Sequence, residues 1–205
     1  DSATSMLTLS GASTYTGGLF IKNGTVKGLG SINAFGTNAN LITIGDTSGS
    51  ADATLLSGLW ATYLQPIAIA SNNTGIATIR ADNNTGFAGP VTLYDHDLTL
   101  SVPVPPGTGA GLVMSGGITG RGNLTLTVGD ANGRAGAITF STLPVDNTGT
   151  ITNAGHGTGN VTISGGVGSN VTAIAEASTN SALIIDTTAI TVNSGGTTLS
   201  NTSPG

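Results

Sequence analysis

Residues Leu7–Val26 read LTLSGASTYTGGLFIKNGTV, and this stretch sets the pattern of the whole chain. A short apolar strand, Leu7–Leu9, leads into a small polar segment. The pair Gly17-Gly18 then precedes a second apolar run, Leu19–Ile21, which ends at Asn23-Gly24. Glycine pairs and Asn-Gly are turn signals, and short alternating apolar runs are strand signals. The stretch therefore predicts strand, turn, strand and turn in quick succession.

The same alternation recurs along the chain as an apolar-Thr-apolar unit, for example in Ile42-Thr43-Ile44 and Leu98-Thr99-Leu100. Such a period of two predicts strands whose aliphatic side chains face a core and whose threonines face outward. The nearest approach to a helix is Ala51–Tyr63, but Gly58 interrupts it and β-formers fill its second half. We therefore predict an all-β protein.

Hydroxyl and amide groups, rather than charges, dominate the polar side chains. Of 205 residues, 33 are Gly, only 7% are charged and 4% are aromatic, whereas roughly 25% of the residues of an ordinary soluble domain are charged. Disordered chains combine low hydrophobicity with high net charge. Here 38% of residues are hydrophobic and the net charge is −5, so we expect a folded chain. The length suits a single domain over residues 1–205.

The composition also excludes several classes of partner. The absence of cysteine rules out disulfides and thiolate metal sites. The five basic residues are scattered one at a time, so we expect no nucleic-acid partner. No apolar run approaches the roughly 20 residues of a membrane helix, so we expect no membrane insertion. The chain opens at Asp1 without Met or a basic segment, as a mature or excised product would.

Two architectures fit many short strands. A β-sandwich spaces its strands by about 8–12 residues with hairpin turns, whereas a β-solenoid stacks similar coils on one another. Recurring phrases such as Met114–Gly120 and Val161–Gly166, with uncharged turns, favour a parallel β-solenoid, and the sandwich is the alternative. At about 20 residues per coil, the chain would form roughly ten coils. The Pro/Gly-rich segment at about 101–111 should protrude as a loop.

The opening stretch also resembles a known repeat. Gly11–Gly18 followed by Ile21–Val26 is similar to the autotransporter-associated β-strand repeat, approximately G-A-N-T-Y-T-G-G-T-T-I-N-x-G-T-L. Ser13 stands in place of the usual Asn, and Leu19-Phe20 in place of the usual Thr pair. The resemblance implies a passenger domain of a secreted or cell-surface bacterial protein. It also implies a right-handed parallel β-helix in an extracellular location.

The sequence offers little chemistry for catalysis. Enzymes built on β-helices need clustered carboxylates, often a cation, and a nearby Lys or Arg. Acidic residues are here spread along the chain, so we expect no enzyme. The densest polar cluster is Asp95-His96-Asp97. If it lies on a strand, Asp95 and Asp97 share one face and could hold Ca²⁺ weakly; a solvated turn is the simpler interpretation, and no other cofactor is expected.

Candidate surface sites are few. Three aromatic residues are candidates for contact with a carbohydrate or a host surface: Trp60, Tyr63 and Tyr94. Thr-x-Thr pairs such as Thr125–Thr127 suit ice binding, but they do not recur in each coil. Seven Asn-x-Ser/Thr sequons are candidate glycosylation sites: Asn23, Asn72, Asn83, Asn123, Asn160, Asn170 and Asn201.

The ends of the predicted rod lead to a functional hypothesis. Monomeric solenoids cover their open ends with a polar cap, and the sequence predicts none here. We therefore expect copies to stack head to tail, as structural subunits of an extracellular fibre, sheath or surface layer. The alternative is an adhesin passenger module that binds carbohydrate or a host or cell surface. The predicted assembly residues are Met6, Leu7, Leu9, Ile190, Val192 and Leu199.

Overall fold

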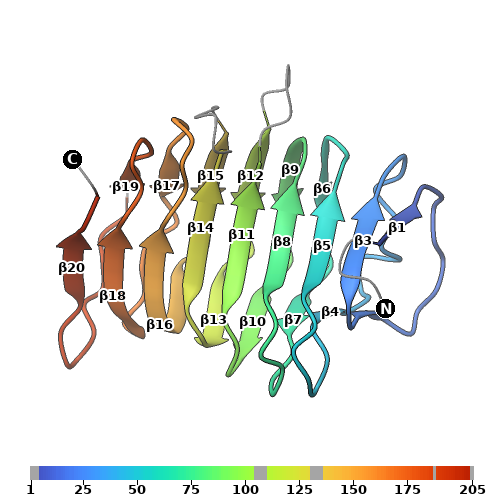
Figure 1. The fold of residues 1–205 in the computed structure, drawn as a ribbon, viewed down its shortest axis with the longest axis horizontal. Coiled ribbons are helices and arrows are strands. Elements are labelled where there is room, and N and C mark those ends of the chain that lie inside the picture. Colours follow the sequence, from blue (N-terminus) through green and yellow to red (C-terminus); the bar gives the residue numbers. More distant parts are fainter. Residues whose placement is uncertain (1–4, 104–109, 130–135, 187, 204–205) are drawn as a thin grey trace.

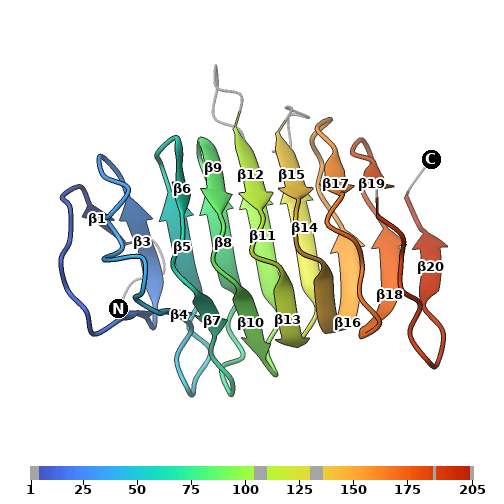
Figure 2. The same cartoon turned by 180° about the vertical axis from the view of Figure 1, so that it is seen from behind.

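A computed structural model describes residues 5–103, 110–129, 136–186 and 188–203. It shows a stack of short parallel strands that runs from the N-terminal to the C-terminal side (Figure 1), with the same stack seen from behind in Figure 2. Within the described residues there is no helix, and therefore none long and apolar enough to cross a membrane. The protein is an all-β solenoid of about 7 turns.

Each complete turn passes through three faces in the order A, C, B. Face A contains β1 (Met6–Leu9), β3 (Gly24–Gly28), β5 (Ala53–Ser57), β8 (Ala77–Ala81), β11 (Leu98–Val102), β14 (Leu124–Val128), the second half of β16 (Val145–Asn153), β18 (Val171–Glu176) and β20 (Thr198–Asn201). Face C contains β6 (Ala61–Tyr63), β9 (Asn84–Phe87), β12 (Gly111–Met114), β15 (Ala137–Phe140), β17 (Val161–Ile163) and β19 (Leu183–Ile185). Face B contains β2 (Leu19–Ile21), β4 (Ile42–Ile44), β7 (Ile67–Ile69), β10 (Val91–Tyr94), β13 (Ile118–Arg121) and the first half of β16.

The strand pairing confirms the solenoid over the sandwich, because every pair between these strands is parallel. The prediction of ten coils is wrong. On face A, Met6 pairs with Thr25, close to the assumed coil length, but Gly24 pairs with Ala53, which is a much longer step. Most coils exceed the assumed length because the corners between strands are longer than minimal turns.

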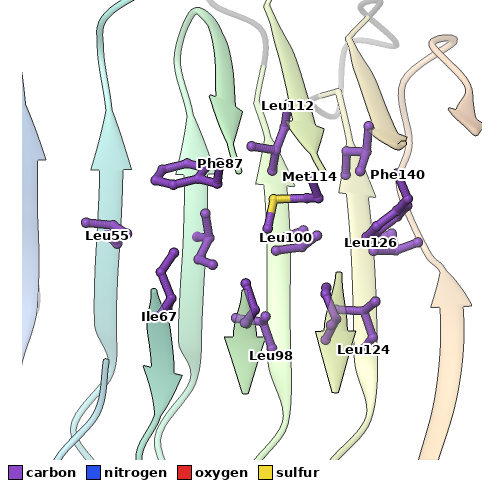
Figure 3. Packing of buried hydrophobic residues seen from close by; sticks show 14 of the residues in the cluster. Leu55, Ile67, Phe87, Leu98, Leu100, Leu112, Met114, Leu124, Leu126 and Phe140 are labelled. Carbon is purple, nitrogen blue, oxygen red and sulfur yellow. The ribbon is translucent and has the colours of Figure 1, made fainter. Parts of the chain in front are cut away.

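The core follows from the alternation seen in the sequence. In β11, the side chains of Leu98, Leu100 and Val102 are buried, while Thr99 and Ser101 are half-buried on the outer side. Figure 3 shows aliphatic residues of successive coils, such as Leu100 and Leu126, packed inside the stack. Burial of this kind contributes about 1.5–3 kcal/mol for each large aliphatic side chain. The interior is therefore a set of rows that run along the solenoid axis.

One of these rows changes character along the axis. The inner row of face A is defined by the strand register and consists of Leu7, Val26, Leu55, Ile79, Leu100, Leu126, Asn153, Glu176 and Asn201. Its members are aliphatic as far as Leu126 and polar from Asn153 onward. This row therefore changes from apolar to polar between β14 and β16, whereas the neighbouring inner row continues as Leu124, Ile151 and Ile174.

An aromatic stack fills the interior behind face C in the early coils. The ring centroids of Phe35 and Tyr63 are 4.9 Å apart, and those of Tyr63 and Phe87 are 5.3 Å apart. Such offset pairs contribute about 0.5–1.5 kcal/mol beyond the area that they bury. Tyr63 is only 1% exposed, so its prediction as a surface-binding residue is wrong. In β6 the side chain of Thr62 points outward, so that of the next residue, Tyr63, points inward.

The stretch that resembles the repeat motif, Gly11–Val26, forms a loop, β2 and the first residues of β3. In the loop, the Ser13 backbone N–H donates to the carbonyl of Asn33 over 3.0 Å, and the Ser13 hydroxyl donates to the carbonyl of Ala34 over 3.1 Å. The buried Asn40 amide donates to the carbonyl of Tyr15. The loop therefore lies against the next coil. Burial raises the pKa of Tyr15.

The predicted loop at 101–111 lies largely outside the described residues. Ser101 and Val102 belong to β11, and Gly111 begins β12, so the boundaries of the predicted loop were too wide. Pro103 ends the ladder of β11, as expected for a residue without a backbone N–H.

Candidate functional site

The outermost strands of face A form two open edges. β1 pairs only with β3, and β20 pairs only with β18, among the described strands. Leu7 is 59% exposed on β1, and Leu199 is 65% exposed on β20. A hollow of about 570 Å³ lies beside β1 and is lined in part by Leu7 and Phe20. Within the described residues, both edges therefore offer unpaired backbone groups beside apolar side chains.

The six predicted assembly residues divide into two groups. Met6, at 52%, and Val192, at 61%, are as exposed as the two leucines at the edges. In contrast, Leu9 and Ile190 are half-buried and pack against the core. Phe20 is 63% exposed on β2, next to the same hollow. Sequence reasoning missed Phe20 because the run Leu19–Ile21 looked uniformly apolar, although its middle residue alternates outward.

The edge on the C-terminal side carries a polar network. The Glu176 carboxylate accepts hydrogen bonds from the Asn153 amide at 2.9 Å and from the backbone N–H groups of Ser178 and Leu183, both at 2.7 Å. The same Asn153 amide also donates to the Ser181 hydroxyl over 3.1 Å. Asn153 is fully buried. Sequence reasoning missed this network because its members lie in different coils or on opposite sides of a corner.

The Asp95-His96-Asp97 cluster is a turn between β10 and β11, as its simpler interpretation predicted. Asp95 has a φ of 54°, so strand alternation does not place it with Asp97. Its carboxylate pairs with Arg121 at 3.2 Å, while Asp97 accepts from the Asn123 backbone N–H at 2.7 Å. The two carboxylates thus have separate partners. Nowhere in the described ranges do three or more His, Asp or Glu residues come together as metal ligands.

The corner beside this turn carries a ladder of polar side chains. The Asn123 amide also donates to Asp97, and its carbonyl oxygen accepts from the Thr150 backbone N–H at 2.9 Å and hydroxyl at 3.0 Å. Asp146 and Asn170 repeat the first step, with the Asn170 backbone N–H donating to the carboxylate at 2.9 Å. These contacts tie successive coils together at one corner.

The two exposed aromatic candidates lie on different faces. Trp60, 77% exposed, directly precedes β6 on face C, and Tyr94, 54% exposed, ends β10 on face B. They therefore do not form one binding surface.

The sequons lie at or near the surface. Asn72, Asn160 and Asn201 are exposed, whereas Asn23 and Asn83 are half-buried. Asn123 and Asn170 are exposed, but their amide groups donate to Asp97 and Asp146. A glycan on either of these two nitrogens would compete with a ladder contact, so the other five are the better candidate acceptors.

A regular row of threonines runs along the outer side of face A. The strand register aligns Thr25, Thr54, Thr78, Thr99, Thr125 and Thr152. Neighbouring strands lie about 4.8 Å apart, so these β-branched side chains pack on one another. Sequence reasoning missed the row because its members are unequally spaced along the chain. On this face a single threonine recurs from coil to coil, although Thr-x-Thr pairs do not.

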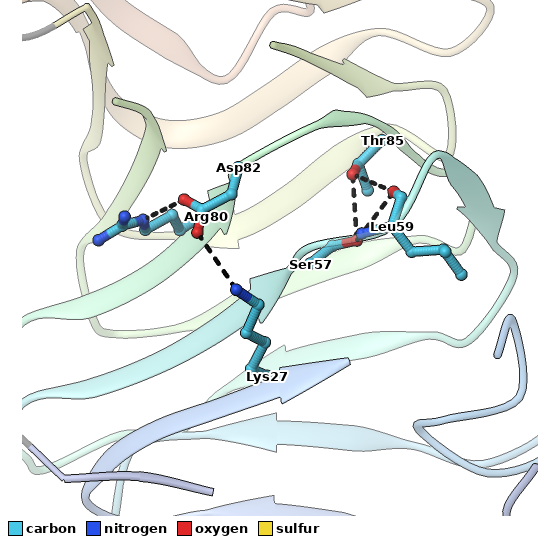
Figure 4. A network of polar contacts seen from close by, with 6 residues as sticks. All are labelled: Lys27, Ser57, Leu59, Arg80, Asp82 and Thr85. Atoms are coloured by element: carbon cyan, nitrogen blue, oxygen red, sulfur yellow. Dashed lines mark hydrogen bonds and ion pairs between the residues drawn. The ribbon is translucent and has the colours of Figure 1, made fainter. Parts of the chain in front are cut away.

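The adjacent outer row carries ion pairs. Figure 4 shows Asp82 between Lys27 and Arg80, with distances of 3.7 Å to Lys27 and 2.7 Å to Arg80. All three residues are half-buried. Pairs of this type are worth about 0–1 kcal/mol each. The Lys27–Asp82 pair links β3 to the residue after β8, across β5, so it joins coils, whereas the Arg80–Asp82 pair lies within one coil.

Comparison with known proteins adds no relative. No protein-family model, curated protein or solved structure matches the chain. The resemblance of Gly11–Val26 to the autotransporter-associated repeat therefore stays a hypothesis.

Proposed function

We propose that this chain is a structural subunit of an extracellular fibre, sheath or surface layer in which solenoids join end to end. The observation that supports it is the pair of open edges on face A. β1 and β20 each lack a second neighbour among the described strands, and they expose Leu7 and Leu199. Adding a coil to such an edge would extend the backbone ladder and bury these side chains, worth about 1.5–3 kcal/mol each. The partner would be a second copy of the chain.

The wider features of the molecule agree with a structural role. The described coils are tied together by backbone ladders, corner contacts such as Asp97 to Asn123, and a continuous apolar interior. Few charges are available to repel a copy, since only 7% of residues are charged. The secreted or cell-surface location and the right-handed coil, both implied by the repeat resemblance, belong to the same proposal.

Cysteine cross-linking tests the join, because the natural chain has no cysteine. Met6 and Ser200 occupy the same outer row, so they would face each other if the strand register continued from one copy to the next. Parallel neighbours lie close enough for a disulfide, which needs Cα atoms about 4.4–6.8 Å apart. A variant with Met6→Cys and Ser200→Cys should give a ladder of covalent multimers on a non-reducing gel. Electron micrographs of the same material should show filaments.

A second cysteine pair tests the register of the join. In the unbroken register Asn201 would lie over Leu7, whereas a shift by one pleat would place Leu199 there and match aliphatic with aliphatic. The pair Thr8→Cys and Ser200→Cys reports that shift. The control pair Met6→Cys and Thr99→Cys, with one partner in the middle of the row, should give no ladder.

A monomer in light scattering over a wide concentration range, with no ladder from either edge pair, would overturn the proposal. A further coil supplied by more of the same polypeptide would extend the same edges. If such a further coil covers the edges, the present chain should be a stable monomer and none of its variants should form filaments.

A further inference from the structure

The outer side of face C is hollowed beside the tryptophan. A groove of about 330 Å³ is lined by Trp60, Thr62, Asn84, Gly86, Val113 and Ser115, and we name it the face C groove. Trp60 is the one tryptophan of the chain and is 77% exposed. A large, well-exposed indole at the rim of a groove is costly to leave against water, so its position points to a ligand.

Buried hydroxyl groups hold the backbone that presents Trp60. The carbonyl of Leu59 accepts a hydrogen bond from the Thr85 hydroxyl at 2.9 Å, and the Leu59 N–H donates to the Ser57 hydroxyl over 3.3 Å. The Thr85 and Ser57 hydroxyls are in turn 3.1 Å apart, as Figure 4 shows. Ser57 is fully buried and Thr85 is 2% exposed. The residue before Trp60 is therefore fixed from beneath, and the indole is presented by a rigid corner.

A glycine forms the floor of the groove. In the outward row of face C, Gly86 lies between Thr62 and Val113. A β carbon on Gly86 would lie 2.8 Å from the Thr62 hydroxyl oxygen, so a side chain there would fill the groove. The strand below is closed to a peptide, because β9 already pairs with β6 on one side and β12 on the other. An incoming strand would find no free backbone groups on this floor.

The lining of the groove decides the chemistry of the ligand. It contains an aromatic ring, the hydroxyls of Thr62 and Ser115 and the amide of Asn84, and no charged side chain lines it. The ion pairs of Lys27, Arg80 and Asp82 are on face A. A charged ligand would find no counter-ion in the groove and would lose hydration without compensation. A ligand with an apolar C–H face and a hydroxyl-bearing edge fits both halves of the lining.

We propose that the face C groove is a binding site for a neutral saccharide. A pyranose ring would lie with its C–H face against the Trp60 indole, and its hydroxyls would exchange hydrogen bonds with Asn84, Thr62 and Ser115. This site is independent of the edges of face A, so it does not rest on the fibre proposal.

The single tryptophan makes its fluorescence a specific reporter of the groove. We expect a saturable change of emission when the natural chain is titrated with neutral oligosaccharides, with cellohexaose and maltohexaose as the probes. Oligogalacturonate serves as the charged comparison and should bind at least tenfold more weakly. Gly86→Val should weaken binding by roughly tenfold or more because it fills the floor. In calorimetry, Trp60→Ala should show a similar loss.

Two matched controls separate the groove from general effects. Tyr94→Ala removes an exposed aromatic from face B, and Gly17→Ala adds a β carbon that meets nothing within 4 Å. Both should bind as the natural chain does. The proposal is overturned if neither neutral probe changes the emission, if Gly86→Val binds unchanged, or if oligogalacturonate binds as well as the neutral probes. An emission change that depends on protein concentration without sugar would instead assign the groove to contact between copies.

Discussion

The first and last coils of the solenoid fill the same inner row of face A with different kinds of side chain. The inner row of face A is aliphatic through Leu126, and it continues as Asn153, Glu176 and Asn201. In the aliphatic part, any side chain of suitable volume can fill its place, because dispersion and burial have no direction. In the polar part, Asn153 is fully buried and Glu176 half-buried, so each must find hydrogen-bond partners.

The two parts of the row differ in the substitutions that they tolerate rather than in how strongly they stabilise the fold. The Glu176 carboxylate accepts hydrogen bonds from Asn153, Ser178 and Leu183, and each bond depends on the position of the others. An aliphatic row loses stability in proportion to the volume removed. A polar row loses it when one partner is missing, even if the volume is unchanged. Substitutions that keep volume and change chemistry, or the reverse, should therefore separate the two regions.

The largest expected effect is in the aliphatic part. Leu100 is fully buried in the middle of the row, so Leu100→Ala should lower the free energy of unfolding by about 2–5 kcal/mol. The matched control is Leu199→Ala at the open edge of the unassembled subunit, where the side chain is 65% exposed; at protein concentrations too low for assembly we expect a change within about 0.5 kcal/mol. Urea denaturation of both variants measures the difference. Equal losses would contradict the assignment of Leu199 to an open edge.

The next effect is in the polar part. Glu176→Gln keeps the volume but replaces one acceptor oxygen with a donor that faces the N–H groups of Ser178 or Leu183. We expect a loss of about 1–3 kcal/mol, the cost of an unsatisfied buried group. Hydrogen exchange should show the loss in β18 and β19 before it reaches the central coils. As a control, Asn201→Gln changes an exposed member of the same row and should have little effect. An unaltered Glu176→Gln protein would mean that the network adds no stability.

A smaller effect is expected from a polar group inside an apolar stack. Burial raises the pKa of Tyr63, and the hydrogen bond with Ser57 acts in the opposite direction. Because the folded-state pKa is raised, the contribution of Tyr63 is complete below about pH 10, its unfolded value, and is lost as the pH rises through the folded-state pKa. Tyr63→Phe should therefore make alkaline unfolding less steep, while costing about 1 kcal/mol at neutral pH through the lost hydrogen bond.

Tyr15 provides the comparison for that experiment. Burial raises its pKa as well, but among the described residues its hydroxyl has no hydrogen-bond partner. Tyr15→Phe should flatten the alkaline limb without the cost at neutral pH. If both variants lose the same stability at neutral pH, the contact between Tyr63 and Ser57 is not responsible for the difference.

The smallest effect concerns a corner rather than a row. The Thr47 backbone N–H and the ion pair with Lys22 hold the pKa of Asp46 below its ordinary value. With a lowered folded-state pKa, its contribution is complete above the unfolded value of about 3.9 and is lost as the pH falls through the folded-state pKa. Asp46→Asn should remove a small part of the acid sensitivity and leave stability at neutral pH almost unchanged. Acid titration followed by circular dichroism measures this, and a large loss at neutral pH would contradict it.

Local pattern was sufficient for the secondary structure and the class of fold. The apolar-Thr-apolar units became strands with Thr99 and its equivalents outward and Leu98 and Leu100 inward. The same reasoning failed where the backbone of a corner decides whether a side chain points inward or outward. Tyr63 lies inside because β6 begins just after the exposed corner of Trp60. Asp95 has a positive φ, so it does not follow the alternation of a strand. The candidate sites were therefore predicted less well than the strands.

The sequence by itself determined that this protein is built from short strands with an aliphatic inside and a hydroxyl-rich outside, because the side-chain period of a strand is local. Only the tertiary structure decided which residues stack. The threonine row, the polar network around Glu176 and the face C groove all join residues of different coils. Because successive coils differ in length, no fixed spacing in the chain encodes these neighbours. The register of the backbone hydrogen bonds between coils decides instead which residues become neighbours.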